Sequence, residues 1–218
     1  MCFPLSFRVI VSDYDRTLTD ERLNFFYPML SIIRALKKKF KFLLASGRRL
    51  EFFFDKPYLL SLFDAIIAEN GGLLYLPKDN LILTFGLEEA RKIKEALSDI
   101  PREEGKVIVS VKRKREEEVK KILRERNISA NLEYNRDSLM LLPLGINKAY
   151  ALNKVLENEE KILVIGDGEN DLSLFERASI KVATGDAVKE VKDKADFVCL
   201  EPCAYGVYRL LHDILIRC

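Results

Sequence analysis

Two aspartates one residue apart pose the first chemical question in this sequence. Asp13 and Asp15 directly follow the apolar run Val9, Ile10 and Val11. If strand geometry persists between the two aspartates, their side chains point roughly the same way. Carboxylates that close repel each other, and each resists losing its water. A divalent cation is the obvious partner to hold this pair together.

Other polar side chains stand at the ends of further apolar runs. In an open α/β sheet the ligand crevice lies beyond the carboxyl ends of the strands, so these side chains are predicted to meet at one edge. Each of them alone is explained as a helix cap, a turn residue or a surface charge. The candidate positions are Asp13, Asp15, Thr17, Ser46, Gly47, Arg48, Lys148, Asp167, Asn170 and Asp171.

The combination of these residue types indicates phosphoryl chemistry. Several carboxylates at one rim would repel, whereas their hard oxygens suit Mg²⁺, which binds one or two carboxylates together with waters and phosphate oxygens. The hydroxyls of Thr17 and Ser46 and the amine of Lys148 then fit as donors to a phosphoryl group. The expected partner is therefore a small phosphorylated metabolite.

The elements that position these residues alternate along the chain. Continuous apolar strands followed by amphipathic helices predict a parallel sheet covered on both faces. The predicted strands are 7–12, 41–46, 64–70, 161–167, 180–184 and 196–200. The predicted helices are 28–39, 49–56, 147–158, 170–177, 187–193 and 205–216.

Between residues 77 and 146 the pattern changes to strands with helices on one face. Helices are predicted over 87–100 and 116–127, a strand over 106–114, and a hairpin of 128–134 with 138–144. This α+β pattern interrupts the α/β sheet, and it predicts a small inserted domain.

Charge and composition restrict the classes of function. The 36 Lys and Arg residues exceed the 34 Asp and Glu residues by only two, so no global field attracts nucleic acid or an anionic membrane. The basic run 112–115 is followed at once by acidic residues, which is the pattern of a solvated helix face. No apolar stretch approaches the roughly 20 residues of a membrane span. The first residues are too short and too quickly charged for a secretory signal, so a cytoplasmic protein is expected, as a monomer or homodimer.

The cysteines and the single histidine make a zinc site a weak interpretation, because no CxxC pair is present. A Cys199–Cys203 bridge is compatible with the spacing, but two thiols fit a reducing cytosol better. The chain has neither Gln nor Trp and many charged residues, which points to a thermophilic source.

Four motifs in order carry a resemblance to a known family. DYDRT at 13–17 resembles the DxDx[TV] motif of the haloacid dehalogenase superfamily of phosphohydrolases. Ser46 is similar to the second motif and Lys148 to the third, and GDGEND at 166–171 is close to the fourth, GDxxND. The insertion, with AENGG at 68–72, resembles the C2-capped, Cof-like branch. The short insertion is most similar to that of archaeal phosphoglycolate phosphatases.

The resemblance implies a Rossmann-like core, residues 1–76 and 147–218, with a C2-type cap at 77–146. It implies Mg²⁺-dependent hydrolysis of a small phosphomonoester through an aspartyl-phosphate. The implied substrate is 2-phosphoglycolate, and a sugar phosphate or a phosphomutase reaction are alternatives. A receiver domain would lack the cap and the second aspartate, and a binding protein would not need every catalytic position filled.

The resemblance also implies roles for single residues. Asp13 would be the nucleophile, and Asp15 the general acid and then the general base. Mg²⁺ would be held by Asp13, the Asp15 carbonyl and Asp167, with Asp171 as a ligand or a support. The phosphate and substrate contacts would come from Thr17, Ser46, Gly47, Arg48, Lys148 and Asn170.

Two positions depart from the family pattern. Arg16 stands where the family usually has glycine. Its side chain would either touch the substrate or lean into solvent, and the second is the preferred prediction. Asp186 stands where relatives often carry asparagine. Arg48 and Arg49 on the core rim suggest a site for a substrate carboxylate, because a guanidinium matches a carboxylate in charge and shape.

Overall fold

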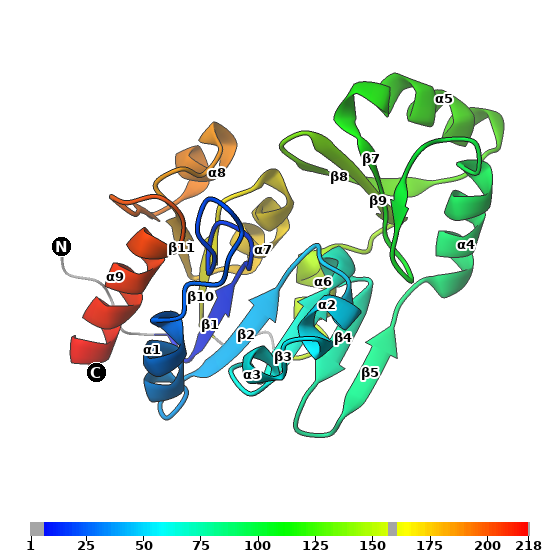
Figure 1. The fold of residues 1–218 in the computed structure, drawn as a ribbon. Coiled ribbons are helices and arrows are strands. Elements are labelled where there is room, and N and C mark those ends of the chain that lie inside the picture. Colours follow the sequence, from blue (N-terminus) through cyan, green and yellow to red (C-terminus); the bar gives the residue numbers. More distant parts are fainter. Residues whose placement is uncertain (1–6, 157–160, 218) are drawn as a thin grey trace.

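The computed structural model describes residues 7–156 and 161–217, and it contains two β-sheets (Figure 1). The larger sheet has the strand order β12-β11-β10-β1-β2-β3-β4-β5. Six of its strands are parallel, namely β1 (Val9–Ser12), β2 (Lys41–Ala45), β3 (Ala65–Ala68), β10 (Ile162–Gly166), β11 (Ile180–Ala183) and β12 (Phe197–Val198). The strands β4 (Leu73–Leu76) and β5 (Leu81–Thr84) extend it in antiparallel fashion.

Helices pack on both faces of the larger sheet, and this confirms the predicted α/β fold. One core contains side chains from α1 (Met29–Leu36), α2 (Leu50–Phe54), α3 (Pro57–Leu60) and α9 (Cys203–Arg217). The opposite core contains side chains from α6 (Lys148–Leu152), α7 (Leu172–Arg177) and α8 (Lys189–Lys194). Side chains along β1 alternate between the two cores, since Ile10 packs in the first core whereas Val9 and Val11 pack in the second.

The smaller sheet is antiparallel and has helices on one face. Its strand order is β6 (Glu103–Glu104), β7 (Val109–Lys112), β9 (Ser138–Pro143) and β8 (Ala130–Asn135). The helices α4 (Leu87–Ala96) and α5 (Glu116–Glu125) cover its outer face. A second apolar cluster around Ile108 and Met140 lies on the other face. This arrangement agrees with the predicted inserted α+β pattern.

The division of the chain at residues 77 and 146 stays a prediction. The structure adds one fact that bears on it, because β5 pairs with β4 in the larger sheet rather than in the smaller one. The predicted helix over 147–158 is shorter, since α6 ends at Leu152, and residues 157–158 lie outside the described residues.

Glycines with left-handed backbone lie in both connections between the sheets. Gly86 has φ +67° between β5 and α4, and Gly145 has φ +79° between β9 and α6. A side chain is strained in that region of φ, which glycine adopts freely. At Gly86 a Cβ would also stand 2.7 Å from the Pro143 side chain, so the two connections pack closely.

None of the helices in the two described ranges has the length and apolar character of a membrane span.

A buried carboxylate ties the segment between β6 and β7 of the smaller sheet to the larger sheet. Glu69, in the short helix η1 (Glu69–Gly71), is fully buried. Its oxygens accept hydrogen bonds from the backbone N–H groups of Lys106, Val107 and Ile108 at 2.9, 2.7 and 3.0 Å. Gly105 permits this approach, because a Cβ there would lie 2.4 Å from the carboxylate.

Replacing this carboxylate should destabilise the protein strongly. In Glu69→Ala three N–H groups lose their acceptor, and at about 1 kcal/mol or more for each unsatisfied group we expect a loss of about 3 kcal/mol. Urea unfolding measures it, with the exposed Glu88→Ala as control. A change below about 1 kcal/mol would show that water replaces the carboxylate at no cost.

Candidate active site

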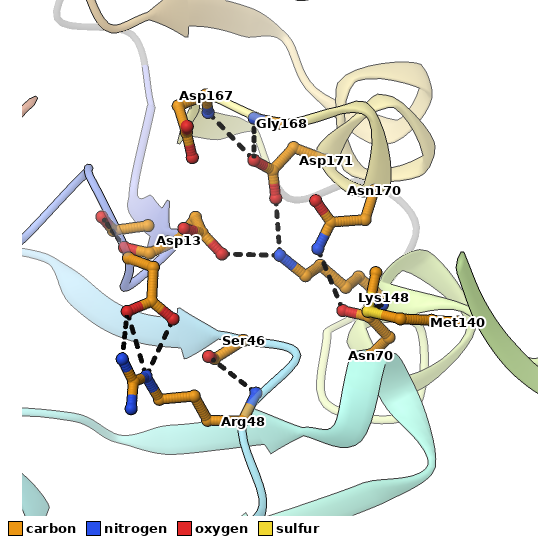
Figure 2. Close-up of polar contacts among 12 residues, drawn as sticks. Asp13, Ser46, Arg48, Asn70, Met140, Lys148, Asp167, Gly168, Asn170 and Asp171 are labelled. Atoms are coloured by element: carbon orange, nitrogen blue, oxygen red, sulfur yellow. Dashed lines mark hydrogen bonds and ion pairs between the residues drawn. The ribbon is translucent and has the colours of Figure 1, made fainter. Parts of the chain in front are cut away.

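Lys148 is the centre of the polar cluster at the carboxyl ends of β1 and β10 (Figure 2). Its side chain is fully buried. The Nζ atom donates to Asp13 Oδ1 and to Asp171 Oδ1, each at 2.6 Å. The Asn147 side chain caps α6 by accepting a hydrogen bond from the Tyr150 N–H. This cap fixes the start of α6 and so the position of Lys148, its first residue.

Asp171 shapes the turn that follows β10. It lies in the short helix η3 (Glu169–Asp171), and its Oδ2 accepts from the N–H groups of Asp167 and Gly168 at 3.0 and 3.2 Å. Gly166 allows this fold-back, since a Cβ there would meet Asp171 Oδ2 at 2.6 Å. Both oxygens of Asp171 are therefore already engaged, one by Lys148 and one by the turn.

Burial and like charge govern the electrostatics of the cluster. Burial raises the pKa of Asp13, and the carboxylates of Asp171, Asp167 and Asp15 add to the rise, against the effect of Lys148. Burial also raises the pKa of Asp167 to about 7, with Asp171 contributing. Burial alone would lower the pKa of Lys148, but Asp13 and Asp171 outweigh it and raise that pKa. The Lys148 amine therefore stays charged at neutral pH. The positive charge near Asp13 and Asp167 is too small to offset their burial and mutual repulsion.

Three carboxylates of this cluster form a set suited to a divalent cation. Oxygen atoms of Asp13, Asp167 and Asp171 all lie within 4.8 Å of one another, and all three residues are buried. Hard carboxylate oxygens are the ligands that small divalent cations prefer. The raised pKa values of Asp13 and Asp167 fit the same interpretation, because a bound cation would relieve their repulsion.

Asp15 lies beside this set and is held by a core arginine. Arg48 Nε contacts Asp15 Oδ1 and Oδ2 at 3.0 and 2.8 Å, and Arg48 Nη2 contacts Oδ1 at 2.6 Å. The Arg48 guanidinium also lies 4.0 Å over the Phe52 ring. Ser46 Oγ accepts from the Arg48 backbone N–H at 3.1 Å. The bidentate contact between the Arg48 guanidinium and Asp15 orients the Asp15 carboxylate.

Asn170 connects the cluster to β9 of the smaller sheet through Asn70. Its Nδ2 donates to Asn70 Oδ1 at 3.1 Å, and Asn70 Nδ2 lies 3.3 Å from the Met140 sulfur of β9. Asn70 has φ +49°, a left-handed conformation within the ENG element. The sequence resemblance includes that element but implies no role for Asn70.

A cavity of about 660 Å³ opens between these residues and the smaller sheet. Of the predicted site residues, Asp13, Asp15, Gly47, Arg48 and Asn170 line it. Its other lining residues are Leu23, Arg49, Phe52, Glu103, Glu104, Gly105, Ile108, Ser110, Asn135, Ser138 and Met140.

The remaining predicted residues lie outside this lining. Lys148 and Asp171 are fully buried. The Thr17 hydroxyl is buried, and it finds no hydrogen-bond partner among the residues that the structure describes.

Comparison with known proteins identifies the family of this chain. The family described as haloacid dehalogenase-like hydrolase matches residues 84–211, which is more than half of the chain. The chain belongs to the haloacid dehalogenase-like hydrolases. The predicted family is thereby confirmed.

Relatives of this hydrolase extend the similarity over nearly the whole chain. Phosphoglycolate phosphatase 2 of Saccharolobus solfataricus is 33% identical, over 95% of this chain and 92% of that protein. A phosphoglycolate phosphatase of Sulfurisphaera tokodaii is 31% identical, over 95% and 94%. A solved structure from Thermoplasma acidophilum has a TM-score of 0.80 at 26% identity, covering 96% of this chain and 99% of that one. These findings confirm the predicted fold and the predicted enzyme class, a phosphoric monoester hydrolase.

The two departures from the family pattern contact each other. Arg16 Nη1 lies 3.3 Å from Asp186 Oδ2, although the two residues are 170 positions apart. The prediction that Arg16 leans into solvent is therefore wrong, because its side chain is only one-third exposed and makes this ion pair. The left-handed φ of +56° at Arg16 explains why glycine suits the position.

Asp186 also holds Cys203, whose backbone N–H and Sγ lie 2.7 and 3.2 Å from its carboxylate. Cys199 and Cys203 are both free thiols, as the preferred interpretation of their spacing predicted. Cys2 and Cys218 lie outside the described residues.

Glu133 of β8 should make the stability of this hydrolase depend on pH. Burial raises the pKa of Glu133 to about 7, against Lys148 and the Asn131 amide, which donates to it at 2.9 Å. Because this pKa lies above the ordinary value of 4.5, folding favours the protonated form, and that stabilisation is lost as the pH rises through about 7.

We therefore expect Glu133→Gln to raise Tm by a few degrees at pH 8 and by much less at pH 5, at about 2–4 °C per kcal/mol. Thermal unfolding at both pH values measures this, with the exposed Glu125→Gln as control. Equal shifts at the two pH values would contradict the assignment.

Proposed function

We propose that this hydrolase is a Mg²⁺-dependent phosphatase that acts through an aspartyl-phosphate and takes 2-phosphoglycolate as its substrate. The observation that carries the proposal is the buried Lys148 amine, 2.6 Å from both Asp13 and Asp171 beside a set of three carboxylates. The two relatives named phosphoglycolate phosphatase at 33% and 31% identity support the substrate. We infer a cytoplasmic enzyme, which the free Cys199 and Cys203 support.

Asp13 would attack the phosphorus atom through a carboxylate oxygen. The bond from phosphorus to the ester oxygen breaks, and Asp15 donates a proton to the leaving alkoxide. Asp15 then removes a proton from water, which attacks the aspartyl-phosphate, releases phosphate and restores the Asp13 carboxylate. The Arg48 contacts at 2.6 to 3.0 Å would aim Asp15 for both proton transfers.

Other side chains would stabilise charge on the phosphoryl oxygens. Asp13 and Asp167 would hold Mg²⁺, with Asp171 as a support, because both Asp171 oxygens already accept hydrogen bonds. When bound, Mg²⁺ would supply positive charge that offsets the charge on the phosphoryl group. Lys148, Ser46 and Asn170 would add donors around the same group.

Arg49 is the side chain best suited to recognise a substrate carboxylate. It lines the cavity, and no described residue forms an ion pair with it. Arg48, by contrast, is already paired with Asp15. We therefore assign carboxylate binding to Arg49 and positioning of Asp15 to Arg48.

Phosphate release from a panel of esters tests the function. The panel contains 2-phosphoglycolate, sugar phosphates and a neutral alkyl phosphate, each with Mg²⁺ or with EDTA. We expect Mg²⁺-dependent release that is fastest from 2-phosphoglycolate. Faster release from a sugar phosphate would overturn the substrate, and a product that retains phosphate would indicate a mutase.

Replacing each arginine should separate the two roles. Arg49→Ala should lower kcat/KM for 2-phosphoglycolate by about 10²-fold, the scale of about 3 kcal/mol for a lost charged hydrogen bond, and leave the alkyl phosphate nearly unchanged. Arg48→Ala should slow both esters alike, because Asp15 loses its support. Unchanged selectivity in Arg49→Ala would sink this assignment.

A further inference from the structure

An arginine of the smaller domain, which comprises the smaller sheet with α4 and α5, contacts a carboxylate of the core. Arg136 stands at the turn between β8 and β9, and its Nη2 lies 2.8 Å from Asp167 Oδ2. The same Nη2 lies 3.4 Å from the Asp186 carbonyl oxygen. The Arg136 Nε is buried without a hydrogen-bond partner in the described parts of the chain. The guanidinium is thus held mainly by Asp167.

The tip of this hairpin is braced against η3. The Arg136 backbone N–H donates to Glu169 Oε2 at 3.1 Å. Arg113 Nη1 donates to Glu169 Oε1 and to the Arg136 carbonyl, each at 3.0 Å. Glu169 therefore contacts both arginines, and these contacts join the smaller domain to the core beside the proposed metal ligands.

The backbone at Arg136 indicates that its side chain matters. Its φ is +52°, a left-handed conformation that costs a residue other than glycine roughly 1 kcal/mol. Asparagine or glycine adopts this conformation more readily at a hairpin turn. The contact with Asp167 is what an arginine adds here.

Asp167 can be neutralised by the Arg136 guanidinium or by a divalent metal ion, and repulsion between the two disfavours both at once. Among the described residues, Lys148 and Arg136 form the ion pairs with Asp13, Asp167 and Asp171. A divalent cation on the same carboxylates would repel both cationic side chains. The Lys148 side chain is fully buried and cannot leave, whereas the Arg136 side chain is 36% exposed and stands at the tip of a hairpin.

We propose that Arg136 is a latch that competes with the metal for Asp167. Its guanidinium neutralises Asp167 and holds the tip of the β8–β9 hairpin against the core. A cation bound to Asp167 displaces the guanidinium and releases the hairpin tip. This inference rests on the metal site of the proposed function, and by linkage the latch and the metal weaken each other equally.

Mg²⁺ affinity, measured by titration calorimetry without substrate, tests the competition. We expect Arg136→Met to bind Mg²⁺ about tenfold more tightly than wild type, within the usual range of coupling between two sites. Arg16→Met is the matched control, because Arg16 pairs with Asp186 outside the carboxylate set. Equal tightening in Arg16→Met, or no tightening in Arg136→Met, would overturn the latch.

Glu169→Gln distinguishes the latch from a general effect of charge. This change removes a negative charge near the site, so simple electrostatics predicts weaker Mg²⁺ binding. Glu169→Gln also weakens the contacts that hold the Arg136 backbone against η3. If Arg136 competes with the metal, Mg²⁺ should therefore bind more tightly to this variant. Weaker binding in Glu169→Gln would count against the proposal.

Hydrogen exchange of the hairpin at 130–143 reports on release. Mg²⁺ should speed exchange at the hairpin tip in wild type, whereas in Arg136→Met exchange should be fast with or without Mg²⁺. Slower exchange with Mg²⁺ in wild type would overturn the latch alone. No Mg²⁺ binding by wild type would overturn both the latch and the metal dependence of the proposed function.

Discussion

Asp13→Asn should reduce phosphate release by roughly 10⁴-fold or more, the scale at which removing a nucleophile acts. The substitution keeps the shape of the side chain and an oxygen near Lys148, but an amide cannot form an acyl phosphate. Asp13 directly follows β1, its backbone N–H donates to the Ile165 carbonyl at 2.9 Å, and it lines the cavity. The carboxylate is therefore held where a phosphoryl group would meet it.

The measurement is the rate of phosphate release with Mg²⁺, with the exposed Asp99→Asn as control. Acid quenching of wild type during turnover should also trap labelled phosphate on the peptide that contains Asp13. Wild-type rates in Asp13→Asn, or label on another peptide, would exclude the covalent mechanism at this residue.

Lys148→Met should destabilise the metal-free protein by about 3–5 kcal/mol, the cost of breaking a buried ion pair. The change leaves Asp13 and Asp171 buried without the amine that lies 2.6 Å from each. Because burial already raises the pKa of Asp13 above 3.8, the variant should lose stability as the pH rises from about 4, where the carboxyl is protonated in the folded chain.

Urea unfolding at pH 5 and pH 8 measures this loss, with the exposed Lys189→Met as control. Mg²⁺ should restore part of the stability at pH 8, because it offsets the same carboxylates. Phosphate release should fall by at least 10²–10³-fold, as for a lost oxyanion donor. Wild-type stability at pH 8 would show that Lys148 does not neutralise the cluster.

Local pattern is sufficient to predict the positions where the chemistry gathers. The apolar runs that become β1, β2 and β10 are continuous, and the polar residues follow each of them within a few positions. Parallel strands bring such residues to one edge whatever their separation along the chain. For this reason the sequence by itself predicts that Asp13 and Asp171 lie together, whereas Lys148, which opens α6 before β10, is placed with them by the family resemblance.

Pairings between side chains are decided only by the tertiary structure. Arg48 binds Asp15 from 33 positions away, Arg136 binds Asp167 from 31, and Arg16 binds Asp186 from 170. Each of these arginines carries a charge that a sequence pattern explains equally well as solvated. For Arg136 the partner depends on how the two sheets pack, which sets the position of the hairpin tip. For Arg16 and Arg48 it depends on the loops that follow β1, β2 and β11 at one edge of the larger sheet.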